Sequence, residues 1–175
     1  MKKRHILFLL VLANSPAMAE QTCDSHSYPM SMHAEQYQDN GDGTVTDNQS
    51  KLTWMRCSLG QTWTGTSCTG SPTTHSLPVA LAEACKLNEQ GGYAGRSDWR
   101  VPQIPELAMI VERQCNNPRT NQVLFPETPA SYFWTATSPA DPGNGYVLSF
   151  GVEGAKYKGR EETLNVRLVS GGKPM

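Results

Sequence analysis

Five cysteines in a chain that carries an export signal constrain this fold more than any other feature of the sequence. They are Cys23, Cys57, Cys68, Cys85 and Cys115. An odd number leaves at least one thiol unpaired or available to a partner. Cys57 and Cys68 enclose a short polar segment, and closing so small a loop costs little chain entropy, so we expect this pair to form a disulfide. Spacing alone leaves the second disulfide open, and no C-x-x-C motif suggests a redox pair or a zinc ribbon.

The N-terminus predicts export. A positively charged segment over 2–4 precedes a short apolar run over 6–13, and an A-x-A cleavage site follows at 17–19. We therefore expect a signal peptide over 1–19 and a secreted chain that begins at Glu20. The apolar run is too short to span a bilayer, and no cysteine follows the cut directly, so neither a membrane span nor a lipoprotein anchor is expected. Such a signal delivers a chain to the periplasm, the cell surface or the medium, where disulfides persist.

The remaining residues suit a single domain. The chain of 175 residues keeps 156 after cleavage, enough for one hydrophobic core. We expect an irregular N-terminal segment over 20–37, followed by one domain over 38–175. Without the three cations of the signal peptide, the 15 Lys and Arg side chains fall to 12 against 16 Asp and Glu, a net charge of −4. That balance argues against general nucleic-acid binding, which needs a basic face.

Hydrophobic periodicity predicts an α+β domain in which two helices pack on short antiparallel sheets. Ser76 and Pro78 begin the first helix, and Pro105 opens the second. The residues expected to share a buried helix face are Leu77, Leu81, Ala84 and Asn88 on the first helix, and Leu107, Ile110, Val111 and Gln114 on the second. Strands are expected over 44–46, 52–55, 132–137, 146–152 and 164–169.

The stretch DNGDGTVTD, over 39–47, has the composition of a calcium loop. Aligning Gly43 with the sixth position of the calcium template puts Gln38 first and Gln49 twelfth, so both ends lack a carboxylate. Asn-Gly and Asp-Gly instead supply the positive φ of a tight turn before a β-prone segment. We expect a turn that starts a strand, and no metal site.

Four blocks of the sequence resemble a known family. They read DNGDGTVTDNQSKLTWMRCSLGQTW, GGYAGRSDWRVPQIPEL, VLFPETPASYFWTATS and NVRLVSGG, and together they run from about 38 to 172. In this order they resemble the C-terminal domain of the Legionella collagen-like protein. The resemblance implies a fold similar to C-type lectins and to formylglycine-generating enzymes, and its name-giving member is an adhesin for sulfated glycosaminoglycans. It also implies a second disulfide between Cys23 and Cys115, with Cys85 as the extra thiol.

Residues that carry related activities are missing. C-type lectins that bind sugars through calcium use Glu-Pro-Asn and Trp-Asn-Asp, whereas this chain has Asn-Pro-Arg at 117–119 and Trp-Thr-Ala at 134–136. Formylglycine-generating enzymes need two late cysteines, and none follows Cys115. No G-x-S-x-G or H-E-x-x-H motif occurs. We expect a non-catalytic protein without a cofactor.

A basic segment is the first candidate for a binding surface. Lys156, Lys158 and Arg160 alternate with Tyr157 in AKYKGR, and in an extended strand the three cations would point to one side and meet sulfate groups. The neighbouring acids over 153–162 dilute this positive field. The alternative is a solvated edge strand whose lysines oppose aggregation.

Aromatic side chains are the second candidate, because a neutral sugar or a peptide packs against exposed rings beside amides. The candidates are Trp63, Tyr93, Tyr132 and Tyr146. The tryptophans of the shared blocks, Trp54, Trp99 and Trp134, are expected in the core. Arg100 is expected to be a structural arginine that pairs with Asp98 or Glu106.

These features predict an exported, non-catalytic binding domain for a glycan, with a sulfated glycosaminoglycan as one candidate, or for another surface polymer. The ligand-binding residues expected are Lys156, Tyr157, Lys158, Arg160, Tyr132 and Tyr146. The alternative is a structural or protein-interaction module of the envelope. The unpaired Cys85 leads to the hypothesis of a disulfide-linked dimer.

Overall fold

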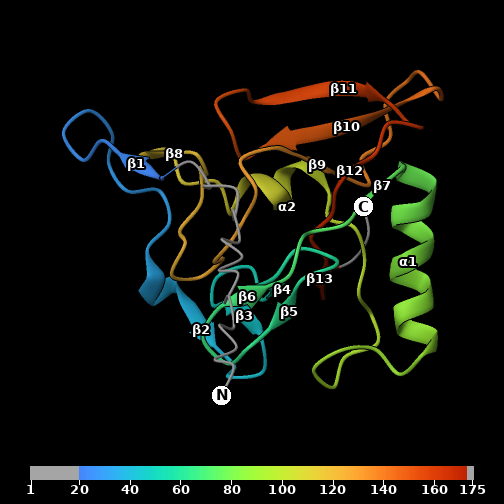
Figure 1. Ribbon diagram of the computed structural model, residues 1–175, viewed down its shortest axis with the longest axis horizontal. Helices are drawn as coiled ribbons and strands as arrows, with labels where there is room; N and C mark the ends of the chain where they lie inside the picture. Colours follow the sequence, from blue (N-terminus) through green and yellow to red (C-terminus); the bar gives the residue numbers. More distant parts are fainter. Residues whose placement is uncertain (1–19, 173–175) are drawn as a thin grey trace, which may run out of the picture.

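The computed structural model describes residues 20–172, and the expected signal peptide lies outside the described residues. Within them, two α-helices accompany two larger sheets and two small strand pairs (Figure 1). All strand pairings are antiparallel except that of β12 with β9. The expected α+β class is confirmed. No helix among these residues is long and apolar enough to cross a membrane.

The first sheet joins the two ends of the domain. It has the order β13-β4-β3-β2, formed by Val169–Ser170, Thr53–Met55, Thr44–Asp47 and Tyr37–Asp39. The turn between β2 and β3 is the predicted one, because Gly41 and Gly43 adopt φ of 76° and 88°. Asp42 accepts hydrogen bonds from the backbone and hydroxyl of Thr44, so its carboxylate stabilises this turn.

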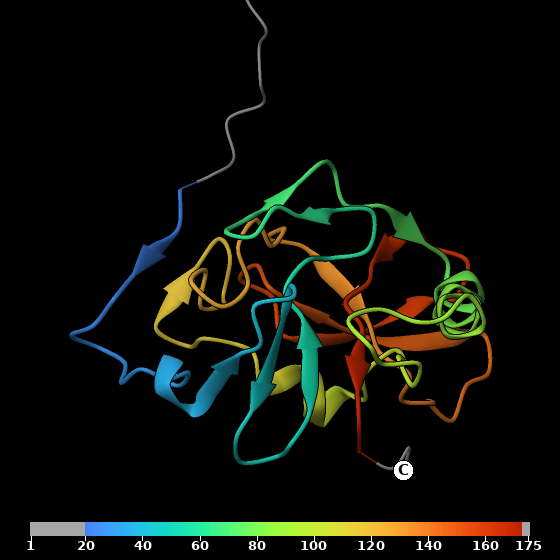
Figure 2. The same ribbon diagram turned by 90° about the horizontal axis from the view of Figure 1, so that it is seen from below.

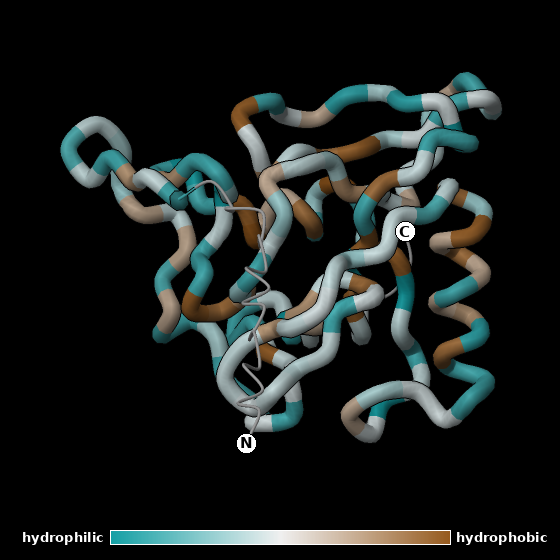
Figure 3. Tube along the Cα trace, viewed as in Figure 1, coloured by the Kyte–Doolittle hydropathy of each residue, from teal (hydrophilic) through white to brown (hydrophobic). Residues whose placement is uncertain are grey.

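The second sheet has five strands in the order β11-β10-β9-β12-β7. They are Ala155–Gly159, Asn144–Ser149, Tyr132–Trp134, Leu164–Asn165 and Thr74–His75. Figure 3 shows hydrophobic residues along β10 and mostly hydrophilic ones along the outer strand β11. The single strand expected over 164–169 is wrong: the chain leaves this sheet after β12 and enters the first sheet at β13.

The two helices differ from expectation in their details. Helix α1, Leu77–Glu89, begins after Ser76 as predicted and lies at one side of the molecule, seen end-on in Figure 2. Its buried face contains Ala80 rather than Leu81, whose exposed fraction is 37%. Helix α2, Ile104–Ala108, is only five residues long, so the longer amphipathic helix expected from Pro105 onward is wrong.

Tertiary hydrogen bonds explain why α2 ends early. The Thr120 hydroxyl donates to the Ile110 carbonyl at 2.8 Å, and the Glu112 amide donates to the Arg119 carbonyl at 3.0 Å. These groups would otherwise continue the helix. Ile110 still reaches the core, with an exposed fraction of 0%.

The core consists of two hydrophobic clusters. One gathers around Phe125, Phe133 and Phe150, and it includes Leu107 of α2. The other packs the buried face of α1 against Trp99 and Trp134. The tryptophans expected in the core, Trp54, Trp99 and Trp134, are at most 1% exposed.

Two disulfides are formed, Cys57–Cys68 and Cys23–Cys115, and Cys85 on α1 is free and exposed. The second bond fastens the N-terminal segment, which also pairs through β1 (Thr22–Cys23) with β8 (Cys115–Asn116). A short 3₁₀ turn, Ala34–Gln36, follows before β2. Residues 24–33 form no helix or strand.

Candidate binding site

A hollow of about 420 Å³ opens between the Cys57–Cys68 loop, the β2–β3 turn and α1. Trp63 and Tyr93 give it aromatic walls, and we call it the aromatic pocket. Apolar atoms also come from Met55, Leu59 and Leu87, and polar groups from Asp42, Ser58, Gln61 and Thr62. Its size and its mixture of rings with a few polar groups are typical of small-ligand sites.

Arg56 packs against the ring of Trp63 and helps to position it. The guanidinium carbon lies 4.2 Å from the indole centroid, a cation–π contact. Arg56 is itself fixed, because it donates to Asp39 at 2.6 Å and to the carbonyls of Leu124 and Val123 at 3.0 and 2.6 Å. A buried, fully engaged arginine therefore supports the ring that faces the pocket.

Tyr93 also lines the pocket. Its hydroxyl donates to the Asp42 carbonyl at 2.9 Å, and burial, aided by the Asp42 charge, raises the pKa of Tyr93. Three segments meet closely here: a Cβ on Gly43 would lie 2.2 Å from the Tyr93 Oη and 2.9 Å from the Trp63 Cγ. The glycine predicted for its turn conformation thus also brings the two rings together.

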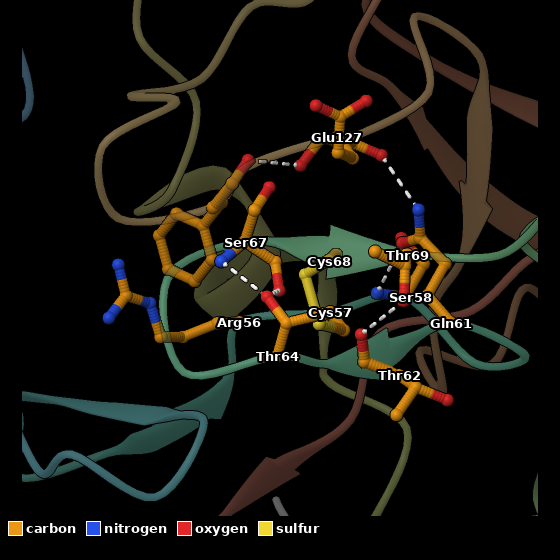
Figure 4. The surroundings of a disulfide bond; sticks show 12 residues. Arg56, Cys57, Ser58, Gln61, Thr62, Thr64, Ser67, Cys68, Thr69 and Glu127 are labelled. Carbon is orange, nitrogen blue, oxygen red and sulfur yellow. Dashed lines mark hydrogen bonds between the residues drawn. A yellow bond between two sulfur atoms is a disulfide. The ribbon is translucent and has the colours of Figure 1, made fainter.

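The Cys57–Cys68 disulfide closes the loop that carries most of the pocket (Figure 4). Inside this loop the short strands β5 (Thr62–Trp63) and β6 (Cys68–Thr69) pair, with Trp63 opposite Cys68. Gln61 accepts from the Ser58 amide and donates to the Glu127 carbonyl, both at 3.1 Å. The loop is therefore anchored by a covalent bond, a strand pair and a side chain.

Arg167 lies behind the pocket and was not anticipated as part of it. Its exposed fraction is 0%, and it donates to the hydroxyls of Thr128 at 2.8 Å and Ser58 at 3.4 Å. The rings of Phe125 and Phe133 lie 4.7 and 5.9 Å from its guanidinium carbon. No ion pair to Arg167 exists among residues 20–172. Burial lowers the pKa of Arg167 to about 9.

The basic segment forms β11, at the edge of the five-stranded sheet. Lys156 and Lys158 point to one face of it, and their Nζ atoms lie 5.9 and 5.4 Å from the Tyr132 ring centroid. Each lysine is paired with a carboxylate, Lys156 with Glu153 and Lys158 with Glu162. The acids therefore neutralise the two cations locally.

The other predicted ligand residues lie elsewhere on this hairpin. Tyr157 alternates with the lysines and so faces the opposite side, where it packs against Tyr146 with ring centroids 4.4 Å apart. Arg160 follows the end of β11 and donates to the Pro142 carbonyl at 3.3 Å. The six residues expected to bind ligand do not share one surface.

Arg100 has the structural role that was expected. It forms a two-pronged ion pair with Glu106, at 2.6 and 2.7 Å, and also donates to the Gly171 carbonyl. Burial raises the pKa of Glu106, but the hydrogen bonds from Arg100 and Gln103 outweigh it, so the pKa ends below its ordinary value. Asp98 instead accepts from Ser170 and Gly171.

Residues 20–172 contain no group of three or more His, Cys, Asp or Glu side chains close enough to hold a metal ion. The pocket was only partly visible in the sequence. Trp63 and Tyr93 were separate aromatic candidates, and nothing in their spacing indicated that α1 and the turn bring them together.

Comparison with known proteins and protein families identifies the family of this chain. No curated protein matches the chain. The family model of the Lcl C-terminal domain matches residues 43–170, most of the chain and both aromatic walls of the pocket. The chain therefore belongs to the Lcl C-terminal domain family.

Proposed function

We propose that this domain is an exported, non-catalytic binding protein that recognises a glycan of a surface polymer in the aromatic pocket. The observation that carries the proposal is that Trp63 and Tyr93 both line a hollow of about 420 Å³. Sugars present C–H faces that pack on aromatic rings, and hydroxyls that bond to carboxylates and amides. Asp42 and Thr62 supply such polar groups at the pocket.

The hairpin of β10 and β11 gives weaker support to the sulfated ligand that the basic segment suggested. Its two lysines are already paired with Glu153 and Glu162, and a sulfate would have to compete with those carboxylates. Exposed ion pairs contribute little and weaken with salt. We therefore place the glycan in the pocket and treat the hairpin as a secondary surface.

The proposal also includes two expectations from the sequence. The family resemblance implies a C-type-lectin-like fold, and the N-terminus predicts export. A C-type-lectin-like arrangement is supported by two helices, small antiparallel sheets and two disulfides. Export to the periplasm or cell surface is supported by the N-terminal signal pattern and by disulfides that persist in oxidising compartments.

The test is a glycan array with the secreted chain from Glu20 to Met175, with and without a calcium chelator and at two salt concentrations. We expect binding that is indifferent to chelator and nearly insensitive to salt. Trp63→Ala should abolish it, and Tyr157→Ala, on the exposed hairpin, should leave it unchanged. Salt-sensitive binding that disappears in a Lys156→Ala, Lys158→Ala variant would move the site to the hairpin. No binding to any glycan would overturn the proposal.

The second candidate is a protein-interaction module of the envelope. One observation favours it: the outer side of α1 exposes Pro78, Val79, Leu81 and Ala82 around the free Cys85. Contiguous exposed apolar side chains are typical of surfaces that meet another protein. A pull-down from envelope extract with the wild type and with a Val79→Glu, Leu81→Glu variant separates this function from glycan binding, which should survive those changes.

A further inference from the structure

A second, smaller pocket of about 190 Å³ lies between the start of α1, the loop that joins β9 to β10, and the residue that follows β11. Among the residues of 20–172 that line it, Arg160 alone carries a charge, so we call it the Arg160 pocket. It shares no lining residue with the aromatic pocket. The two hollows are therefore separate sites of the same domain.

The backbone and side chain of Arg160 are held by two segments that lie far from each other in the sequence. Its amide donates to the Gly143 carbonyl at 3.1 Å, and its carbonyl accepts from the Leu77 amide at 2.9 Å. Its Nη1 donates to the Pro142 carbonyl at 3.3 Å, and Pro142 lines the pocket as well. These three contacts fix the guanidinium at the pocket.

Most of the donors of this guanidinium remain free. An arginine offers five N–H donors, and among residues 20–172 that of Arg160 donates only to Pro142 and forms no ion pair. The neighbouring acids do not compensate it. Asp141 accepts hydrogen bonds within its own loop, Glu162 is paired with Lys158, and Glu161 is exposed and does not line the pocket. A pocket with an unpaired cation and no lining acid favours an anionic ligand.

The shape and charge of the guanidinium favour a carboxylate among the anions. Its planar fork can donate two parallel hydrogen bonds to the two oxygens of a carboxylate. One cation balances one negative charge. A dianionic phosphate or a polysulfated chain would leave further charge uncompensated beside apolar side chains, which is costly. The pocket therefore suits an anion with a single charge.

The walls of the Arg160 pocket are mainly apolar. Leu77 is 6% exposed, and a Cβ on Gly145 would lie 2.7 Å from its Cδ2, so Leu77 is packed closely against β10. Leu81, Ala136 and Pro139 line the same hollow. Its volume is below the range of ~300 to 1,000 Å³ that drug-sized ligands occupy. The apolar part of the ligand must therefore be short.

We propose that the Arg160 pocket binds a carboxylate carried by a short apolar group. The guanidinium donates to both carboxylate oxygens, and the apolar group packs on Leu77, Leu81 and Ala136. A free short-chain acid and the last residue of a peptide both present this chemistry. The inference goes beyond the proposed glycan binding and does not depend on it, because the two sites are separate.

The test is an NMR titration of the chain from Glu20 to Met175 with butanoate and with butanamide, which have the same shape and differ in charge. We expect butanoate to bind at least tenfold more tightly, with shifts in the amides of 77–81 and 136–145. Arg160→Gln should remove that preference. Arg113→Gln, which removes an exposed arginine outside the pocket, should keep it.

A second pair of probes, N-acetylalanylalanine and its C-terminal amide, distinguishes the two sources of the carboxylate. Tighter binding of the peptide acid than of butanoate would assign the end of a peptide chain, and the reverse would assign a free acid. Equal affinity of acid and amide in both pairs, or no binding of either acid, would overturn the proposal. Tighter binding of a sulfated heparin disaccharide at the same amides would overturn it in favour of a polyanion. The comparison on the wild-type protein remains decisive even if Arg160→Gln fails to fold.

Discussion

Arg167 is an uncommon residue, a fully buried guanidinium with no carboxylate partner among the described residues. Burying such a charge without a partner costs about 3 kcal/mol or more. Two phenylalanine rings and two hydroxyls offset part of that cost. Its Nε and Nη1 atoms still lack acceptors. A buried cation that the fold holds at such a cost fits a role at the pocket.

The burial of Arg167 leads to a stability prediction. Burial lowers its pKa to about 9, well below the ordinary value, so at pH 7 both states hold the proton and the fold carries the whole cost. Arg167→Met should therefore be as stable as the wild type or more stable at pH 7, by up to about 3 kcal/mol. The advantage should shrink above pH 9, where the folded wild type sheds its proton. Urea unfolding of both proteins at pH 7 and pH 10 measures this. A loss of several kcal/mol in the variant at pH 7 would contradict it.

Glu112 has the opposite character, a buried carboxylate that is fully satisfied. It accepts from the amides of Ser31, Met32 and Gln114 at 2.8 to 3.1 Å, and from the Ser31 hydroxyl. Burial raises the pKa of Glu112, but the hydrogen bonds from Gln114, Ser31 and Met32 outweigh it and the pKa ends below 4.5. This one side chain therefore fastens the N-terminal segment to the body.

Glu112→Gln should lower the free energy of unfolding by about 3 kcal/mol at pH 7, because an amide donor would face backbone donors. The stability that the wild-type carboxylate contributes is complete above pH 4.5 and is lost as the pH falls through the lower folded pKa. The difference between wild type and variant should then close in acid. Thermal unfolding from pH 7 to pH 3 checks this, with Glu89→Gln, an exposed helix position, as the control. A constant difference across that range would show that ionisation is not the cause.

At the scale of elements, the disulfide loop of 57–68 determines whether the pocket exists. Removing the bond with Cys57→Ala, Cys68→Ala should cost about 3 kcal/mol, the loop-closure entropy of a loop of this size. Trp63 would then depend on a two-residue strand and on Arg56. We expect glycan binding to fall at least tenfold while near-ultraviolet circular dichroism still reports a folded core. Cys85→Ala is the matched control and should change neither property.

The β2–β3 turn offers a test of the pocket that separates the effect of backbone strain from the effect of a steric clash. Gly41 and Gly43 both have positive φ, so either alanine substitution costs about 1 kcal/mol of strain. A Cβ at Gly41 meets nothing within 4 Å, whereas one at Gly43 meets Tyr93 and Trp63. Gly43→Ala should therefore abolish binding, and Gly41→Ala should preserve it at equal strain. Equal binding by the two variants, measured by titration with the preferred sugar, would remove the pocket from consideration.

The elements that the sequence predicts well are the ones that local chemistry determines. The turn at 39–47 follows from its glycines, and α1 starts where Ser76 and Pro78 predict, although the Ser76 side chain makes no capping hydrogen bond. Helix α2 was predicted too long because Thr120 and Arg119 capture the backbone groups that would have continued it. The buried face of α1 was misplaced by one residue, because Ala80 is buried and Leu81 is exposed. Distant partners decided the length of α2.

The candidate site was also predicted only in part: the sequence showed its residue types but not its distant contacts. Trp63, Tyr93 and the lysines of β11 were visible as residue types, and the disulfide around Trp63 was visible from spacing. The position of Arg167 behind Ser58 was not. That relation joins segments far apart in the chain, so it depends on how the sheets pack.

At the scale of the whole molecule, the free cysteine and the exposed side of α1 raise the question of a second copy. Cys85 is exposed, and Leu81 and Ala82 are exposed on the same helix. In an oxidising compartment two such thiols form a disulfide by passing two electrons and two protons to the disulfide of an oxidant, which becomes a dithiol. A dimer would present two aromatic pockets to one polymer, and linked sites raise apparent affinity without any new contact.

We therefore predict that the chain from Glu20 to Met175 forms a disulfide-linked dimer through Cys85. Non-reducing electrophoresis after oxidation with a glutathione buffer should show a band of twice the monomer mass that disappears on reduction and in Cys85→Ser. The variant should keep the wild-type melting temperature, because both structural disulfides remain. It should bind a single sugar as the wild type does, yet bind an immobilised polymer at least tenfold more weakly. A wild type that stays monomeric under oxidising conditions would leave Cys85 as an isolated surface thiol, and polymer binding would then depend on one pocket alone.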